Sequence, residues 1–258
     1  MTNPYAPDDV AARFYDTIYR KVRNADAGYY LKKIMQAKGP VLEVGVGTGR
    51  IFCPALAGGA DIYGIDLSPA MIGKLKEKIR PEHRKRVTVQ DAARMSIDKK
   101  FDLIIAPFRV FSHLISVRDQ LAVLEKIHSH LKPGGRFIFD VFVPNLKALA
   151  EGMTEKLDFE GTYAPGKSLR RYSSTLIDPI KQIIHVTMRF VWEEKSGEMT
   201  GFWEFPLRYF FRYELEHLIH RSELELDALY GDFYENALES RSEEFLAVCI
   251  RGMQAAGT

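Results

Sequence analysis

The chain has 258 residues, of which 46% are hydrophobic and 27% charged, a composition typical of an ordinary soluble protein with a sizeable core. A net charge of +2, from 36 basic and 34 acidic residues, excludes the basic surplus of a protein that wraps nucleic acid. No apolar run approaches the roughly 20 residues of a membrane span. Two distant cysteines, Cys53 and Cys249, form no disulfide framework, and the chain starts with no secretory signal, so we expect a cytoplasmic protein.

Strand and helix patterns alternate through residues 1–145. The first helix is expected over 8–20, where Val10, Phe14 and Ile18 recur at helical spacing after a cap at Asp8 or Asp9. Further helices are expected at 50–57, from Ser68-Pro69 onward and at 117–131, and strands at 41–44, 61–66, 86–90, 101–106 and 137–141. This alternation predicts a parallel sheet with helices on both faces.

The pattern changes after residue 145. Apolar and polar side chains alternate over Lys181–Trp192 and Met199–Leu207, with a turn at Glu194–Gly197, and an earlier strand is expected near 170–177. These segments predict an antiparallel insertion of about three strands. A helix is expected near 212–222, and an antiparallel hairpin near 224–230 and 244–251. The expected domains are therefore 1–145 with 208–258, and an inserted β-rich unit at 146–207.

A glycine-rich loop follows the first strand. Gly45, Gly47 and Gly49 alternate with other residues after the acidic Glu43. Glycine lets the backbone approach a ligand closely, the following helix N-terminus offers free N–H groups, and the loop lies at the carboxyl edge of the sheet. A dinucleotide-binding loop needs G-x-G-x-x-G, but here the third glycine comes one residue early, and no GK[ST] supports a P-loop.

This loop resembles the first motif of class I S-adenosylmethionine-dependent methyltransferases. Asp66 at the end of the second strand, Asp91-Ala92 after the third and Lys132-Pro133-Gly134-Gly135 before the fifth also match that family. The resemblance implies S-adenosylmethionine as cofactor. It also implies an α/β fold: a Rossmann-like, mostly parallel seven-stranded sheet with helices on both faces, an antiparallel last strand and an inserted antiparallel β lid.

Within the family, the chain resembles the small-molecule branch of glycine and amino-sugar N-methyltransferases. Phe14-Tyr15-Asp16 and Phe111-Ser112-His113-Leu114 carry this likeness. In such enzymes the first helix closes over the cofactor, the acid after the second strand binds the ribose, and the insertion is the acceptor lid. The cofactor residues that the resemblance implies are Tyr15, Glu43, Gly45, Gly47, Gly49, Asp66, Leu67, Asp91, Ala92 and Ala106.

The acceptor side has weaker candidates. A sulfonium is already activated, so the protein mainly has to align the acceptor, and only a hydroxyl acceptor benefits from a base. His113 is the candidate base, or else a histidine bonded to backbone near the cleft. Arg109 either binds an acidic acceptor or forms a surface ion pair, and Arg171 and Tyr172 are further candidate contacts. No metal is expected, because no carboxylate–histidine cluster lies on the cleft loops.

These observations predict methyl transfer to the nitrogen or oxygen of a small-molecule acceptor, with no nucleic-acid or membrane partner. One alternative is a nucleotide-cofactor oxidoreductase on a related sheet. Another is a non-catalytic S-adenosylmethionine sensor or scaffold. A third is a homodimer in which the aromatic insertion buries itself against a partner chain.

Overall fold

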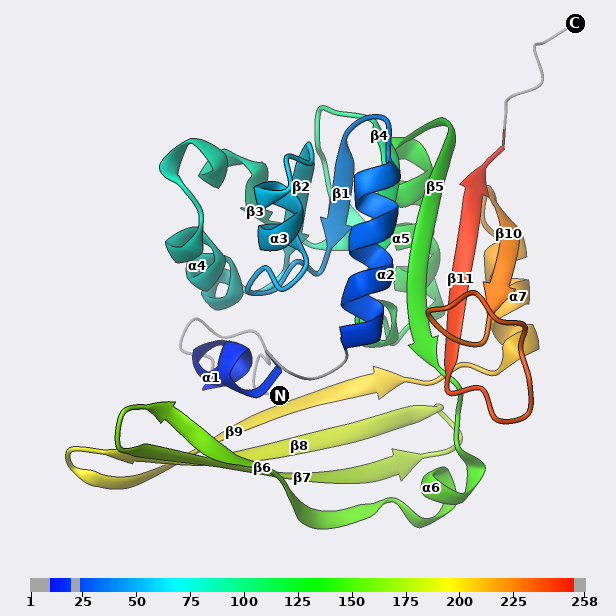
Figure 1. Cartoon of the computed structure of the whole chain (residues 1–258). Helices are drawn as coiled ribbons and strands as arrows, with labels where there is room; N and C mark the ends of the chain where they lie inside the picture. Colours follow the sequence, from blue (N-terminus) through cyan, green and yellow to red (C-terminus); the bar gives the residue numbers. More distant parts are fainter. Residues whose placement is uncertain (1–9, 20–23, 253–258) are drawn as a thin grey trace, which may run out of the picture.

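The computed structural model describes residues 10–19 and 24–252, and its main element is a seven-stranded sheet (Figure 1). The strands are β1 (Val41–Val44), β2 (Ile62–Asp66), β3 (Val87–Val89), β4 (Phe101–Ala106), β5 (Leu131–Phe142), β10 (Leu224–Tyr230) and β11 (Glu244–Arg251). Their spatial order is β10-β11-β5-β4-β1-β2-β3, and β11 alone runs opposite to the other six strands. The predicted mostly parallel sheet with an antiparallel last strand is confirmed.

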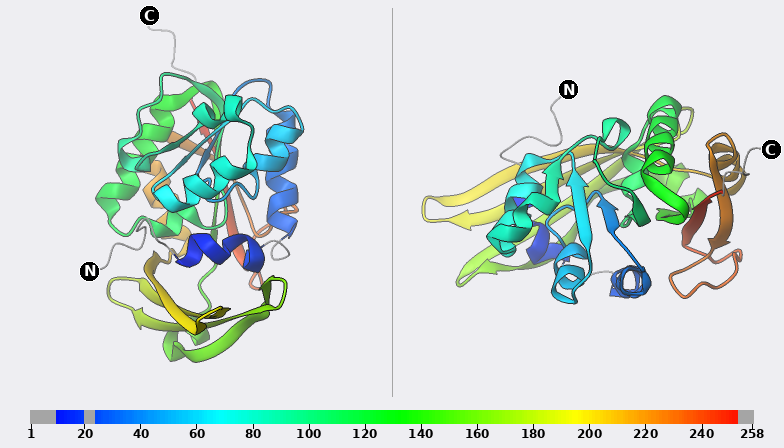
Figure 2. Two further views of the ribbon diagram at one scale, coloured as in Figure 1. Left: turned by 90° about the vertical axis from the view of Figure 1, so that its left-hand side faces the viewer. Right: turned by 90° about the horizontal axis from the view of Figure 1, so that it is seen from above.

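Helices cover both faces of this sheet (Figure 2). One face carries α2 (Asn24–Gln36), α3 (Phe52–Ala57) and α4 (Pro69–Lys78), and the other carries α5 (Val117–His130) and α7 (Arg212–His220). Helix α4 begins as predicted, because the Ser68 side chain accepts a hydrogen bond from the Met71 N–H at 3.2 Å. Helix α2 was not predicted. Short 3-10 turns are η1 (Pro81–Arg86), η2 (Ala92–Arg94) and η3 (Val110–His113).

A second, four-stranded antiparallel sheet follows the short helix α6 (Leu146–Glu151). We call it the lid sheet, and its strands are β6 (Met153–Ala164), β7 (Lys167–Asp178), β8 (Ile183–Glu194) and β9 (Gly197–Arg208). The prediction of about three strands was wrong by one, because β6 was missed. The β8–β9 turn lies where it was predicted, with Glu194 paired to Gly197. That 146–207 forms a domain of its own stays a prediction.

Helix α1 (Val10–Tyr19) lies between the lid sheet and the main sheet (Figure 1). Phe14 is fully buried there, with its ring 5.1 Å from Tyr163 and 5.3 Å from Trp192 of the lid sheet. Met71 of α4 belongs to the same apolar cluster. Side-chain packing of α1 therefore connects the lid sheet to α4, which covers one face of the main sheet. The predicted caps Asp8 and Asp9 lie outside the described residues. Within residues 10–19 and 24–252, no helix has both the length and the apolar character needed to cross a membrane.

Candidate active site

A cavity of about 510 Å³ lies at the carboxyl ends of β1, β2, β3 and β4, where the lid sheet faces the main sheet. The predicted cofactor residues that line it are Tyr15, Gly45, Gly47, Asp66, Leu67, Asp91 and Ala92. Glu43, Gly49 and Ala106 lie outside the lining. Of the predicted acceptor residues, Arg109 and His113 line the cavity, whereas Arg171 and Tyr172 do not.

The three glycines of the loop have different surroundings. Gly47 has φ +54°, and a Cβ added there would meet no atom within 4 Å, so the loop leaves open space at this position. Gly49 has φ +89°, and a Cβ there would collide with Leu75 of α4 and with Cys53. Gly47 therefore suits close approach of a ligand, whereas Gly49 is required for packing the loop against α4.

Asp66 and Asp91 are held in place by backbone N–H groups. One oxygen of Asp66 accepts a hydrogen bond from Gly47 N–H at 2.8 Å, and the other accepts one from Ser68 N–H at 2.8 Å. Burial raises the pKa of Asp66, and the backbone donors oppose that rise. Asp91 accepts a hydrogen bond from Ala93 N–H at 2.9 Å. Each carboxylate oxygen can accept more than one hydrogen bond, so both residues keep capacity for ligand hydroxyl or amino groups.

Glu43 is a buried acid directly behind the glycine loop. Its side chain is 3% exposed, and its Oε2 has no hydrogen-bond partner among the described residues. Burial raises the pKa of Glu43 to about 8; nearby Asp66 also raises it, and Arg50 lowers it. A buried carboxyl oxygen without a partner, next to the open space at Gly47, fits a positively charged ligand group, because such a group would lower the pKa of Glu43 and favour its charged form.

The cavity wall after β4 is strained and is fixed by a buried acid. Phe108 and Arg109 are consecutive residues with φ of 62° and 63°, the left-handed region that non-glycine residues rarely adopt. The carboxylate of fully buried Asp140 accepts hydrogen bonds from both of their N–H groups, at 2.8 and 3.1 Å, and from the Tyr30 hydroxyl at 2.7 Å. The sequence analysis missed Asp140, although a lone acid inside the apolar strand 137–141 is itself a signal that it is bound.

Arg109 lines the cavity, but its guanidinium is engaged elsewhere. Its Nη2 lies 2.6 Å from Oε1 of Glu244 at the start of β11. Arg109 was predicted either to bind an acidic acceptor or to form an ion pair, and the structure contains the ion pair.

Arg171 and Tyr172 are adjacent on β7 and point to opposite faces of the lid sheet. The guanidinium of Arg171 makes two hydrogen bonds to Asp158, at 2.9 and 3.0 Å, and one to the Tyr19 hydroxyl at 2.6 Å. Arg171 therefore reaches the cavity only through Tyr19, which lines it. The Tyr172 ring lies under the guanidinium of Arg189, 4.2 Å away. Tyr172 is on the outer face and does not line the cavity, and its contact with the acceptor stays a prediction.

His113 lies in η3 with its ring centroid 5.4 Å from that of Phe205 in the lid sheet. Burial lowers the pKa of His113 to about 4. The imidazole is therefore neutral at neutral pH, where it can accept a hydrogen bond but binds a proton weakly. It suits orienting an acceptor better than general-base catalysis.

Aromatic rings close the cavity at the α1 end. The Tyr15 and Tyr19 rings lie 4.6 Å apart, and Tyr19 meets Phe108 edge-on at 5.4 Å. Burial raises the pKa of Tyr15, so its phenol stays neutral. Rings in this arrangement attract a cation such as a sulfonium through their π-faces.

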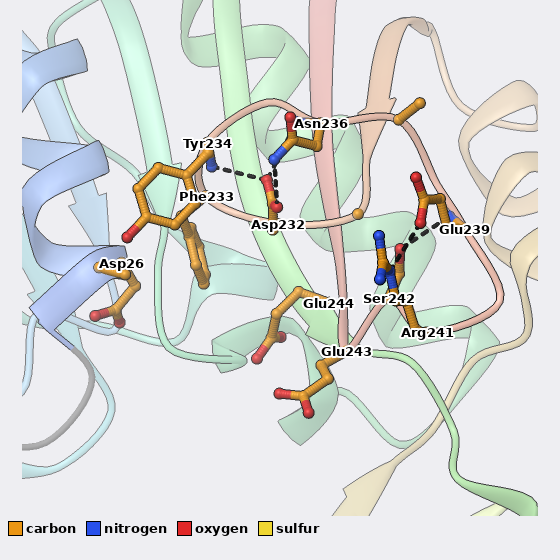
Figure 3. A pocket seen from close by; sticks show the side chains of 13 residues that line it. Asp26, Asp232, Phe233, Tyr234, Asn236, Glu239, Arg241, Ser242, Glu243 and Glu244 are labelled. Carbon is orange, nitrogen blue, oxygen red and sulfur yellow. Dashed lines mark hydrogen bonds and ion pairs between the residues drawn. The ribbon is translucent and has the colours of Figure 1, made fainter.

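A second, larger cavity of about 650 Å³ lies between the start of α2 and the β10–β11 loop (Figure 3). It contains no residue of the glycine loop, and many of its lining residues are acidic. Two of these, Asp26 and Glu244, form ion pairs with Arg50 and Arg109, both at 2.6 Å. The second of these pairs links the two cavities, because Arg109 also lines the first. Among the described residues, no group of three or more His, Cys, Asp or Glu could hold a metal ion.

Comparison with known proteins agrees with this geometry. A family model described as a methyltransferase domain matches residues 42–137, which include the glycine loop, Asp66 and Asp91. A glycine/sarcosine N-methyltransferase from Aphanothece halophytica is 26% identical over 218 residues, covering 83% of this chain and 77% of that protein. Residues 42–137 thus match a methyltransferase domain, and the chain as a whole is similar to S-adenosylmethionine-dependent methyltransferases. S-adenosylmethionine is the cofactor of this family.

Other relatives of the chain match over less of their length. The putative methyltransferase YqeM from Bacillus subtilis is 26% identical over 113 residues, which is 43% of this chain and 46% of that protein. An uncharacterized methyltransferase from Bacillus mycoides is 33% identical over 101 residues, or 39% of this chain and 46% of that protein. The match thus spans about half the length of these two relatives.

Solved structures extend the likeness to the whole fold. An S-adenosylmethionine-dependent methyltransferase from Clostridium acetobutylicum has a TM-score of 0.78 at 19% identity, covering 93% of this chain and 97% of its own. An amino pentose methyltransferase from Micromonospora echinaspora with S-adenosylmethionine bound has a TM-score of 0.68 at 20% identity, covering 92% and 96%. Because these matches cover more than nine tenths of the chain, they include the lid sheet, and they show that the chain has the same fold as these structures.

Proposed function

We propose that this methyltransferase transfers the methyl group of S-adenosylmethionine to the amino nitrogen of a small molecule. One observation carries the proposal: the cofactor motifs and the lid sheet line a single cavity. Gly47 and Asp66 contribute from the main sheet, and Trp203 and Phe205 contribute from β9. A cofactor seated on the glycine loop would therefore meet an acceptor held under the lid.

The residues have separate tasks in this proposal. Asp66 and Asp91 hold the adenosine end by hydrogen bonds. Glu43 is protonated while its site is free of ligand, and the ammonium of the methionine end would favour its charged form on binding. Tyr15 and Tyr19 close the cavity and exclude water. The bound cofactor supplies a methyl group already activated by the positive sulfur. The protein therefore contributes binding and alignment, which is where most of its rate enhancement arises.

Two observations support nitrogen as the acceptor atom. The weakly basic His113 would take a proton from a hydroxyl poorly, whereas an uncharged amine attacks without a base. The similar proteins also include a glycine/sarcosine N-methyltransferase and a sugar N-methyltransferase from Streptoalloteichus with a TM-score of 0.72, 17% identity and 92% coverage of both chains.

The proposal is tested by incubating the purified chain with methyl-labelled S-adenosylmethionine and a panel of amines and phenols. We expect label in an amine product, with S-adenosylhomocysteine formed in equal amount. Label in phenols alone would contradict nitrogen as the acceptor. Cofactor binding without transfer to any member of the panel would favour a scaffold or sensor instead.

A further inference from the structure

The acceptor end of the cavity is walled by apolar side chains of the lid sheet. Met188 of β8 and Trp203, Phe205 and Leu207 of β9 all line it. The Trp203 and Phe205 ring centroids are 4.2 Å apart with their planes inclined by 39°. The Phe205 and His113 centroids are 5.4 Å apart with an inclination of 32°. Three rings thus follow one another along this wall, offering a flat molecule a continuous apolar surface.

Among the residues that the structure describes, this end of the cavity offers little to balance a charged acceptor. The two carboxylates in the lining, Asp66 and Asp91, lie at the ends of β2 and β3, where the proposed function uses them for adenosine. The guanidinium of Arg109 is bonded to Glu244 at 2.6 Å. The lowered pKa of His113, caused by burial, indicates that this region disfavours a positive charge. A zwitterion such as glycine would have to bury both of its charges here.

From this arrangement we propose that the acceptor is an amine carried on a flat, apolar ring system, bound with its nitrogen uncharged and its ring against Trp203 and Phe205. The inference rests on the proposed function, since it names the substrate class of the same cavity. An uncharged nitrogen has a free electron pair to form the new N–C bond as the C–S bond breaks, and the amine then loses one proton. Burial in an apolar site favours this form of the amine.

The acceptor class is tested with the full chain, labelled S-adenosylmethionine and three primary amines: phenethylamine, glycine and glucosamine. We expect kcat/KM for phenethylamine to exceed that for each of the other two by at least about tenfold, because an apolar pocket discriminates by such factors. Equal or faster transfer to glycine or glucosamine would overturn the inference and leave the proposed function standing. Absence of transfer to every amine, with the cofactor bound, would contradict both.

Variants on β9 test the ring wall directly. Trp203→Ala should lower kcat/KM for phenethylamine about tenfold or more, while the S-adenosylmethionine affinity stays within about threefold. Trp203→Phe should restore most of the loss. Phe202→Ala is the matched control, because Phe202 is the preceding residue, points to the opposite face and is 59% exposed. Unchanged turnover in Trp203→Ala, or an equal loss in Phe202→Ala, would overturn the inference.

Discussion

At the scale of single residues, Gly47 tests the ligand-binding role of the loop. Gly47→Val should abolish measurable cofactor binding, because a β-branched residue is strained at φ +54° and its side chain would fill the open space of the cavity. Gly73→Ala is the control: a Cβ there also meets nothing within 4 Å, but the residue lies in α4 with ordinary helical geometry. Calorimetric titration measures both. Normal binding by a folded Gly47→Val variant would contradict the loop assignment.

Asp140 should position the cavity wall after β4, because its carboxylate accepts hydrogen bonds from the N–H groups of Phe108 and Arg109. In Asp140→Asn, an amide NH₂ would replace one acceptor oxygen and face the N–H of Phe108 or Arg109, leaving buried donors unpaired at a cost of about 1–3 kcal/mol. We expect kcat/KM for the acceptor to fall about tenfold or more. The variant Tyr30→Phe removes one donor and keeps both backbone bonds, so its kcat should change little. Equal values of kcat/KM for Asp140→Asn and the wild type would show that this wall needs no such support.

The sequence reveals those site residues that a local pattern places, and it does not reveal those placed by contacts between distant parts of the chain. Asp66 and Asp91 could be placed because each lies at the carboxyl end of a predictable strand, and parallel strands end at one edge of the sheet. The partnership of Tyr30 with Asp140 joins residues 110 positions apart, so no local pattern contains it. Side chains along the lid strands were likewise predicted to alternate between two faces. Which face meets the cavity depends on how the lid sheet packs against the main sheet, and the sequence does not show this.

At the scale of elements, α1 should depend on the lid sheet. Phe14→Ala removes a fully buried ring that contacts Tyr163 and Trp192, at a cost of about 3–5 kcal/mol. Helix α1 should then detach locally, and cofactor affinity should fall because Tyr15 lies on the same helix. Faster hydrogen exchange in α1, together with weaker calorimetric binding, would establish this coupling. Phe14→Leu keeps most of the apolar contact and should show both effects weakly. Unaltered exchange in Phe14→Ala would contradict the coupling.

Two elements, β6 and α2, were not predicted, and each has a physical reason for its weak sequence pattern. Strand β6 is an edge strand with three register shifts against β7, and charged residues such as Glu155, Lys156 and Asp158 interrupt its alternation. Helix α2 has Gly28 in its interior and buries Asp26 in an ion pair with Arg50, so an apolar stripe is not evident. The regularly alternating strands β8 and β9, by contrast, were predicted to within about two residues at each end.

At the scale of the whole molecule, Glu43 should make stability depend on pH. Its pKa is raised from 4.5 to about 8, chiefly by burial. The unfolded chain loses this proton near pH 4.5 and the folded protein only near pH 8, so the folded state holds more protons in between. This contribution to stability is present below pH 4.5 and is lost as the pH rises to about 8.

Glu43→Gln has no proton to lose. Relative to the wild type, its free energy of unfolding should therefore rise by a few kcal/mol between pH 4.5 and about 8, as measured by urea unfolding. Parallel pH profiles for the two proteins would mean that Glu43 is not the group responsible.

The central claim is that the cavity between the glycine loop and the lid sheet holds S-adenosylmethionine. The most direct test is calorimetric titration of S-adenosylmethionine into the wild type, Asp66→Ala and a control, Asp98→Ala, whose side chain is exposed. Removing charge-assisted hydrogen bonds costs about 1.5–3 kcal/mol, so Asp66→Ala should bind roughly tenfold or more weakly while remaining folded by circular dichroism. Asp98→Ala should bind as the wild type does. Unchanged affinity in a folded Asp66→Ala variant would contradict the claim.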